Sequence, residues 1–343
     1  MAIYFLTPDY THPSGGVRVI YRHVDILNAH GMKAYVLHTK PGFRCEWFDN
    51  TTLIAYQDKS LLRKVSSKIL KLLKKELPHE MHLVNKSPTK KLTSTDYLVL
   101  PEIYGPTMTD MAPSVPKVIL NQGCYLTFQG YSLEPKDLTT AYHHPDVKGT
   151  LINSQDGAEY LHYVFPNLNV GRFHLSLDSN LFHFQKTKKR QICFPTKKGE
   201  MLLRQLINIL KFRNALHDFE LVPFADISQQ EVAKIMQDSA IFLNFSQYEG
   251  FGLPPLEAMA CGCIVIGFHA EGGREFFQPE FSYPIENGNI LNFAKTVEQV
   301  IQAFDSAPEK MATMSKAASD YALTHYTPQQ EESDVLDFWK KIL

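Results

Sequence analysis

The sequence lacks the features of disulfide-rich, exported and membrane-spanning proteins. The cysteines are Cys45, Cys124, Cys193, Cys261 and Cys263. They form no CxxC pair and are too sparse for a disulfide scaffold, so reduced thiols in a cytoplasmic protein are expected. No apolar run approaches the roughly 18 residues that a membrane span needs. The apolar stretch AIYFL at residues 2–6 has no basic segment before it, which predicts a first strand rather than a signal peptide.

The sequence also lacks an excess of charge of either sign. It contains 35 Lys and Arg residues against 36 Asp and Glu residues. This balance gives no reason to expect a nucleic-acid partner, and any anionic ligand must be held by local charges. The length of 343 residues is too great for one ordinary core and suits two domains of roughly 150 residues each.

Short apolar runs alternate with helical patterns along most of the chain. The expected strands are residues 2–6, 33–37, 96–100, 117–120, 149–154, 191–194, 219–224, 240–246, 263–268 and 281–285, and the expected helices include 17–31, 202–212, 228–236 and 292–304. Such alternation implies parallel sheets with helices on both faces. The predicted fold class is therefore α/β, with two Rossmann-like doubly wound domains.

A polar, basic stretch at residues 177–191 marks the expected domain boundary. The first domain is predicted to span residues 1–180 and the second residues 190–326. A boundary there leaves a cleft between the carboxyl ends of two sheets, and ligands of open α/β sheets bind in such crevices. Functional residues are therefore expected in the loops that follow strands.

One such loop is EGFGLPPLE, residues 249–257, which follows an expected strand. Glu249 would lie in the loop and Glu257 about one turn into a short helix, both facing the cleft. Gly250 and Gly252 allow backbone amides to approach a ligand, and the helix start favours an anion. Carboxylates bind vicinal hydroxyls, so the combination suits a nucleotide sugar. The alternative is a helix acid that complements the dipole and an unrelated loop acid.

The surrounding sequence resembles a known family. SQYEGFGLPPLEAMACGCIVIGFHAEGGREFF, residues 246–277, looks like the signature of retaining glycosyltransferases of family 4, which have the GT-B fold and a motif of Glu, seven residues, Glu. The resemblance is strong over residues 190–300. It continues more weakly through residues 14–37 and 152–166.

The resemblance implies roles for individual residues of the donor site. Glu249 would contact the hydroxyls of the donor sugar, and Glu257 would hold the ribose of the nucleotide. Gly252 and Leu253 would present backbone amides to the phosphates. The remaining implied donor contacts are Gly15 and Gly16, beneath the diphosphate, and Gly272 and Gly273, in a loop near the donor. For Gly15 and Gly16 the alternative is an ordinary strand-to-helix turn.

The sequence departs from the family at two places. Family members often place arginine and lysine where this sequence has Lys197 and Lys198, which would stabilise the charge on the departing diphosphate. Two lysines lack the bidentate fork of arginine, which leaves open which of them contacts the leaving group, and a solvated surface pair is the alternative. Asn121 and Gln122 stand where the family often has histidine. Either can hydrogen-bond a donor hydroxyl, but neither can act as a base near neutral pH.

These departures fit the front-face mechanism usually inferred for the family, in which the leaving phosphate deprotonates the acceptor. No acidic pair of the DxD type follows an expected strand convincingly. Metal-independent transfer without a cofactor is therefore expected, with a nucleotide sugar as donor and a hydroxyl of a glycan or lipid-linked molecule as acceptor. The acceptor would contact residues 40–115 of the first domain. The sequence does not reveal the sugar, the base or the acceptor.

Two further segments bear on partners and architecture. Residues 59–78 form an apolar stripe flanked by lysines, which predicts either a helix on an anionic membrane surface or a helix packed on the first sheet. The first reading would make the protein peripheral on the inner face of the membrane. In GT-B proteins the last helix crosses back to the first domain, so residues 327–343 are expected to do so, anchored by Phe338 and Trp339.

Two other functions remain open on the sequence. Another GT-B enzyme, such as a nucleotide-sugar epimerase or a glycan phosphorylase, could use the same cleft. A non-catalytic sugar-binding protein could also retain the fold. The pair Glu249 and Glu257 favours transfer over the first. The paired lysines argue against the second, because a pure binder needs no cations at a leaving group.

Overall fold

The computed structural model describes residues 1–57, 89–134 and 139–343, so the predicted basic helix at 59–78 lies outside the described residues. The described chain forms two compact units. Unit 1 comprises Met1–Ile152, Ala158–Phe173 and Glu332–Leu343, and unit 2 comprises Asn153–Gly157 and His174–Glu331. Each unit is built on a parallel sheet with helices, as the alternation of patterns predicted.

Unit 1 contains a sheet with the strand order β4-β3-β2-β1-β5-β6-β7-β8. The strands are β1 (Ile3–Leu6), β2 (Ala34–His38), β3 (Ile54–Gln57), β4 (Thr89–Lys90), β5 (Tyr97–Pro101), β6 (Lys117–Asn121), β7 (Val147–Ile152) and β8 (Val170–Arg172). Every recorded pairing is parallel. The direction in which strands are added reverses at β1, which pairs with both β2 and β5. Ligands of doubly wound sheets bind at the carboxyl ends beside such a switch point.

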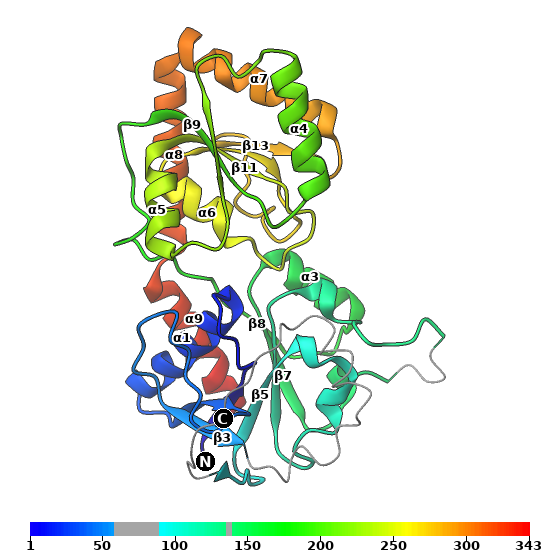
Figure 1. Cartoon of the computed structure of the whole chain (residues 1–343). Helices are drawn as coiled ribbons and strands as arrows, with labels where there is room; N and C mark the ends of the chain where they lie inside the picture. The colour runs from blue at the N-terminus through cyan, green and yellow to red at the C-terminus, as the bar shows by residue number, and fades with distance from the viewer. Residues whose placement is uncertain (58–88, 135–138) are drawn as a thin grey trace. The chain divides into compact units, whose positions relative to one another are not determined.

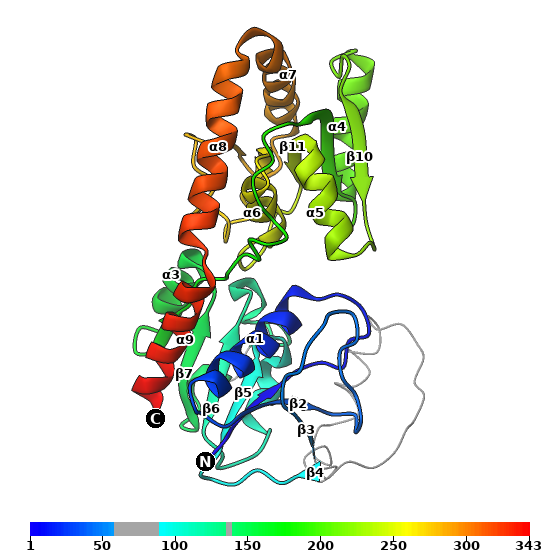
Figure 2. The same cartoon turned by 90° about the vertical axis from the view of Figure 1, so that its left-hand side faces the viewer.

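The helices of unit 1 include α1 (Gly15–Ala29), α3 (Gln155–Val164) and the later part of α9 (Pro328–Ile342). Three short 3-10 segments also lie after strands: η2 (Glu102–Thr109), η3 (Cys124–Leu126) and η4 (Ala141–His143). Figures 1 and 2 show α1, in dark blue, beside α9, in red. An exposed pair between His30, just after α1, and Glu332 of α9 agrees with this arrangement (2.7 Å).

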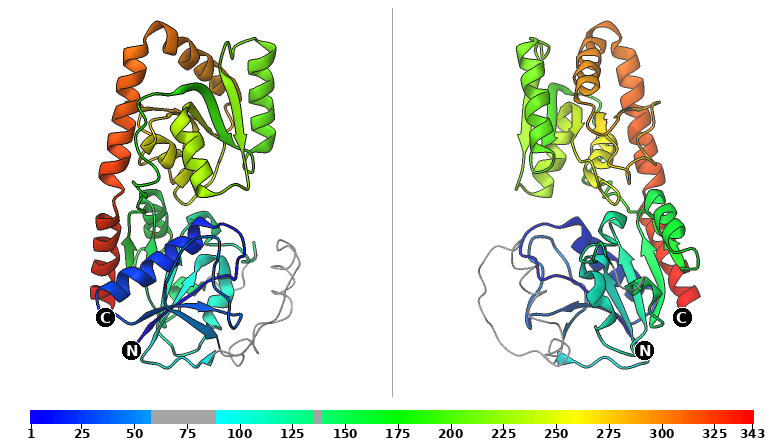
Figure 3. Two further views of the ribbon diagram at one scale, coloured as in Figure 1. Left: turned by 60° about the vertical axis from the view of Figure 1, so that its left-hand side comes forward. Right: turned by 90° about the vertical axis from the view of Figure 1, so that its right-hand side faces the viewer.

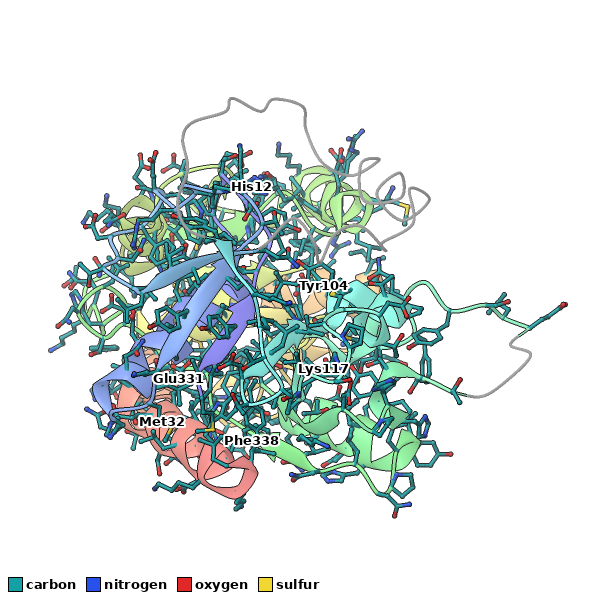
Figure 4. All side chains as sticks on the ribbon, turned by 90° about the horizontal axis from the view of Figure 1, so that it is seen from below. His12, Met32, Tyr104, Lys117, Glu331 and Phe338 are labelled. Atoms are coloured by element: carbon teal, nitrogen blue, oxygen red, sulfur yellow. The ribbon has the colours of Figure 1, made fainter. Side chains whose placement is uncertain are left out.

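The carboxyl-terminal part of α9 packs on the sheet of unit 1 through the anchors that the sequence predicted. Trp339 is completely buried and its ring contacts Phe5 of β1 and Tyr97 of β5, with centroids 6.2 and 5.7 Å apart. Phe338 is also buried, against the glycines of β7 and β8. Figure 4 shows Phe338 on this helix. Burial of two large aromatic side chains ties the end of the chain to the unit that contains its start.

Unit 2 contains a parallel sheet with the order β10-β9-β11-β12-β13. The strands are β9 (Lys189–Pro195), β10 (Glu220–Phe224), β11 (Ser239–Asn244), β12 (Ile264–Phe268) and β13 (Ser282–Ile285). Its helices are α4 (Glu200–Phe212), α5 (Gln229–Asp238), α6 (Leu253–Ala260), α7 (Ile290–Ser306) and α8 (Pro308–His325). Helix α4 packs with α7, whereas α6 packs with α5 and α8, and Figure 3 shows these two groups. A capping box between Ser228 and Glu231 starts α5.

The contact between α9 and β8 leads to a stability prediction. A Cβ added at Gly171 would lie 2.3 Å from Cδ2 of Phe338, so one of the two must move. Gly171→Ala should lower the free energy of unfolding of unit 1 by about 1–3 kcal/mol, as overpacking does. Both tryptophans, Trp47 and Trp339, belong to unit 1, so urea denaturation followed by tryptophan fluorescence reports on it.

The double variant Gly171→Ala/Phe338→Leu is the control, because a smaller side chain at 338 makes room for the methyl group. It should be more stable than the sum of the single changes implies. Strictly additive free energies would show that the two side chains do not meet.

Candidate functional site

The predicted residues of unit 2 lie on loops at one edge of its sheet. Because every strand of this sheet is parallel, all carboxyl ends meet at that edge. Lys197 and Lys198 follow β9, Glu249 follows β11, and residues 269–273 follow β12. The strand order places β9 and β12 on either side of β11.

Lys198 and Glu249 are brought together although 51 positions separate them. Nζ of Lys198 donates a hydrogen bond to Oε1 of Glu249, and Oγ of Ser246 donates to the same oxygen (2.7 Å). The side chain of Glu249 is 22% exposed and that of Lys198 is 61% exposed. A lysine ammonium and a carboxylate therefore meet at a partly exposed place. Both hydrogen bonds end on Oε1 of Glu249, not on Oε2.

The neighbouring lysine has a different partner. Nζ of Lys197 pairs with Asp226, in the loop between β10 and α5, and both side chains are mostly exposed. Exposed pairs of this kind contribute little to stability. Of the two lysines, Lys198 is therefore the one that pairs with Glu249. Which of them contacts the leaving group stays a prediction.

The loop after β12 packs directly against the loop that carries Glu249. The amide of Glu249 donates to the carbonyl of Ala270 (3.0 Å). A Cβ at Gly272 would lie 2.3 Å from the carbonyl oxygen of Gly250, so only glycine permits this approach. The amide of Gly272 donates to Ala270 and that of Gly273 to His269, at 2.8 and 2.9 Å. These two amides form hydrogen bonds within the loop. Direct contact of either glycine with a sugar donor stays a prediction.

Glu271 is a residue of this edge that the sequence did not single out. Its carboxylate accepts from Arg274 and from Nδ2 of Asn287, the latter at 3.0 Å. Ala270 and Glu271 both have left-handed backbones, with φ of 55° and 61°. Non-glycine residues in this region cost about 1–3 kcal/mol each and cluster at functional sites. The consecutive left-handed residues were not readable from the sequence, because neither is glycine or asparagine.

Helix α6 starts immediately after the Glu249 loop. Gly252 is its N-cap, with φ of 98°, and Leu253 is the first helical residue. Pro254 and Pro255 have no N–H, so Leu253 supplies the amide of the first three helical positions. That amide lies at the positive end of the helix dipole, which suits an anion. Glu257 is half-buried in the second turn of α6.

The predicted residues of unit 1 also follow strands, and their roles differ. Nε2 of Gln122 donates to the carbonyl of Gly16 (3.1 Å), joining the loop after β6 to the glycines at the start of α1. Asn121 is completely buried, and Nδ2 donates to Thr127 and to Tyr142, at 3.1 and 2.8 Å. Its Oδ1 accepts from the amide of Gly123 (3.1 Å). Asn121 thus holds the loop in shape, whereas Gln122 reaches the glycine turn.

Glu102 is a second residue that sequence reasoning missed. It follows β5 directly, is buried, and accepts hydrogen bonds from the amides of Gln122 and Gly123. Burial raises the pKa of this carboxyl from 4.5 to about 7, because desolvation outweighs those hydrogen bonds. The signal for this residue in the sequence was a single acid directly after the apolar run of residues 97–101. Glu102 supports the loop through which Gln122 contacts Gly16.

Replacement of Glu102 should change how stability depends on pH. Below pH 4.5 the carboxyl is neutral in both the folded and the unfolded chain. Between pH 4.5 and about 7 the unfolded chain releases its proton while the folded chain retains it, so the free energy of unfolding falls as pH rises. Gln cannot ionise. The stability of Glu102→Gln relative to the wild type should therefore increase by about 3 kcal/mol from about pH 4 to about pH 8.

Urea denaturation followed by tryptophan fluorescence at several pH values measures this difference. Glu46→Gln is the matched control, because Glu46 is exposed in the same unit. Its stability should follow that of the wild type at every pH. A Glu102→Gln curve parallel to the wild-type curve would show that Glu102 ionises normally in the folded chain.

Comparison with known proteins relates this edge of unit 2 to sugar transfer. Residues 198–320 match the family model described as glycosyl transferases group 1. An alpha-1,6-glucosyltransferase of Actinobacillus pleuropneumoniae is 37% identical over 91 residues, which are 26% of this chain and 28% of that protein. A putative glycosyltransferase of a Sulfolobus islandicus filamentous virus is 27% identical over 124 residues, 33% of this chain and 38% of that protein. The matches thus span well under half of either relative.

Solved structures resemble the chain over its whole length. A glycosyltransferase from Rickettsia africae has a TM-score of 0.65 at 13% identity, with 99% of this chain and 98% of that chain covered. A TarM variant from S. aureus, in complex with Fondaparinux, alpha-GlcNAc-glycerol and UDP, has a TM-score of 0.62 at 12% identity, with 100% and 99% covered. The chain therefore has the GT-B fold. Its segment 198–320, which holds Lys198, Glu249 and Glu257, is similar to glycosyl transferases group 1.

Proposed function

We propose that the protein is a retaining glycosyltransferase that moves a sugar from a nucleotide-sugar donor to a hydroxyl of a glycan or lipid-linked acceptor. The observation that carries this proposal is the contact between Lys198 and Glu249 beside the start of α6, inside the matched segment. A cation for a departing phosphate and an acceptor for sugar hydroxyls are thereby placed at one point. Both are needed when a sugar-phosphate bond breaks.

Lys198 would act on the leaving group. As the bond between the sugar and the diphosphate breaks, negative charge grows on the phosphate oxygen, and a fixed ammonium stabilises that charge most in the transition state. In the unliganded chain Glu249 holds the ammonium in place. A bound diphosphate offers a stronger anionic partner, and Glu249 is then available to the hydroxyls of the sugar.

The rest of the donor would lie along α6. The amide of Leu253 suits a phosphate oxygen, and Glu257 suits the hydroxyls of a ribose. A role of Gly15 and Gly16 beneath the diphosphate stays a prediction. We favour a uridine nucleotide because UDP is named in the complexes of TarM and of HepE from Anabaena, which share the fold. The leaving phosphate would take the proton of the acceptor in a front-face reaction that needs no metal.

Membrane association belongs to the same proposal. In the part of the chain that the structure describes, no helix combines the length and apolar character needed to cross a bilayer. An enzyme that glycosylates a lipid-linked acceptor works at the membrane surface. The lysine-flanked stripe at residues 59–78 is the candidate that the sequence offers, and its role stays a prediction.

The two adjacent lysines provide a matched test of the leaving-group role. Lys198→Ala should lower kcat by about 10²- to 10³-fold, with a smaller change in donor affinity, because the lost stabilisation grows in the transition state. Lys197→Ala removes the same charge one position away and should lower kcat by less than about threefold, since its partner is an exposed aspartate. Release of UDP from a panel of UDP sugars is the measurement.

Equal losses in the two variants would contradict the assignment of Lys198. The assay is repeated with EDTA, which should leave the wild-type rate unchanged. A requirement for added magnesium would show that the metal-independent mechanism is wrong.

Variants of the two glutamates should differ in whether they change turnover or the affinity for UDP. Glu249→Gln should lower turnover strongly and leave the affinity for UDP nearly unchanged, because it contacts the sugar. Glu257→Ala should weaken UDP binding by about 1–3 kcal/mol through lost hydrogen bonds to the ribose. Calorimetry with UDP and turnover of the UDP sugar measure the two effects. Normal turnover in Glu249→Gln, or unchanged UDP affinity in Glu257→Ala, would refute the respective role.

A further inference from the structure

A chain of buried polar groups in unit 1 ends on the carboxylate of Asp9. Asp9 lies three residues after β1, and His38 is the last residue of β2. Nδ1 of His38 lies 2.7 Å from Oδ1 of Asp9, and Nε2 lies 2.7 Å from the hydroxyl oxygen of Tyr21 on α1. The amide of Cys45 donates to that same hydroxyl oxygen (3.3 Å). The chain therefore joins α1, β2 and two loops at the carboxyl edge of the sheet.

Hydrogen bonds hold the members of this chain in place. An amide can only donate, so the oxygen of Tyr21 accepts from Cys45. Burial raises the pKa of the Tyr21 hydroxyl far above its usual range, so this group keeps its own hydrogen. The two ring nitrogens of His38 lie between that hydroxyl and the carboxylate of Asp9 and link them.

Asp9 is the only member of this chain that combines a charge with access to solvent. His38 is completely buried, whereas the side chain of Asp9 is 15% exposed. Oγ of Thr39 donates to Oδ2 of Asp9 (2.5 Å), so each carboxylate oxygen has one internal donor. Each oxygen has two lone pairs, and one on each remains for an outside donor. The carboxylate is oriented from within and can accept hydrogen bonds from a ligand.

The surroundings of Asp9 indicate the chemistry of that ligand. Among the described residues no lysine or arginine forms an ion pair with Asp9, so its negative charge disfavours phosphates and carboxylates. Tyr104, in η2 after β5, lies close enough that the charge of Asp9 adds to burial in raising the pKa of its phenol. That phenol therefore stays protonated and can donate. A carboxylate that is oriented from within and forms no ion pair with a described lysine or arginine suits a neutral polyhydroxyl compound.

The loop that carries Asp9 also presents aromatic side chains. The carbonyl of Tyr10 accepts from Nε1 of Trp47 (3.3 Å) and from Sγ of Cys45 (3.8 Å), which fixes the loop. The ring of Tyr10 stacks on that of His12, with centroids 5.2 Å apart and planes 23° apart. Figure 4 shows His12 on this loop and Tyr104 on the segment after β5. Such rings offer apolar faces to the C–H face of a sugar.

We propose that Asp9 anchors the acceptor site of the enzyme, where its carboxylate binds hydroxyls of a neutral sugar. This inference rests on the proposed function. Asp9 acts as a binding group that orients the acceptor, and the proton of the reacting hydroxyl goes to the leaving phosphate. His38, Thr39 and Tyr21 are positioning residues, because they hold the carboxylate without touching the ligand.

Asp9→Asn tests the assignment. Asn keeps the size of the side chain, its oxygen can accept from His38, and the hydroxyl of Thr39 can turn to accept from its amide, so the loop keeps its brace. The probes are the methyl glycosides of glucose, galactose, mannose and N-acetylglucosamine, offered with the UDP sugar that the wild type hydrolyses. The KM for the glycoside should rise about tenfold or more, while the dissociation constant for UDP stays within about twofold.

Asp49→Asn is the matched control, because Asp49 is an exposed carboxylate in the same unit. It should behave as the wild type with every probe.

The outcomes separate this inference from the proposed function. A KM for the glycoside in Asp9→Asn equal to that of Asp49→Asn would overturn it. Equal weakening of UDP and glycoside binding would show instead that Asp9 only braces the glycine turn. A wild type that hydrolyses a UDP sugar but transfers to none of the glycosides would overturn the assignment of a neutral sugar. A wild type that acts on no nucleotide sugar would overturn the proposed function itself.

Discussion

Parallel pairing is the constraint on which the candidate sites of both units depend. A parallel strand can be followed only by a crossover, so each strand delivers its next loop to the same edge of the sheet. In unit 2 this brings Lys198, Glu249 and the 269–273 loop to adjacent positions, although 75 positions of sequence separate the first and last. In unit 1 it does the same for Asp9, Glu102 and Gln122. Parallel pairing alone brings the residues of each group together, so no further interaction is needed to gather them at one edge.

The two edges handle charge in different ways, and the difference follows from burial. In unit 2 the carboxylate of Glu249 is partly exposed and is met by a lysine, an arrangement that a phosphate can replace at small cost. In unit 1 the carboxyls of Asp9 and Glu102 are more enclosed, and no described lysine or arginine pairs with them. Amides hold Glu102, and an imidazole and a hydroxyl hold Asp9. An edge of the first kind suits an anionic donor, and one of the second kind suits a neutral ligand.

The fold could be predicted from the sequence because its signals are local. Apolar runs of four to seven residues alternating with amphipathic helices specify parallel sheets wherever they occur. Helix α8 was missed because its buried positions are filled by small or flexible residues such as Ala318, Ala322 and Met314, which produce a weak stripe. Glu271, Glu102 and the chain from Tyr21 to Asp9 were missed for another reason. Their roles depend on partners from other strands, and no spacing along one segment encodes such contacts.

The two pairs of adjacent polar residues show how far a motif can specify a site. Lys197 and Lys198 are chemically identical, yet one pairs with Asp226 and the other with Glu249. Asn121 and Gln122 carry the same amide group. Asn121 is nevertheless buried and donates to Tyr142 inside unit 1, whereas Gln122 donates to the carbonyl of Gly16. Successive side chains of a strand point to opposite faces, and at both strand ends the two neighbours have different partners. A pair of like residues at a strand end therefore supplies one group to each side, and only the positions of neighbouring strands decide which of the two faces a ligand.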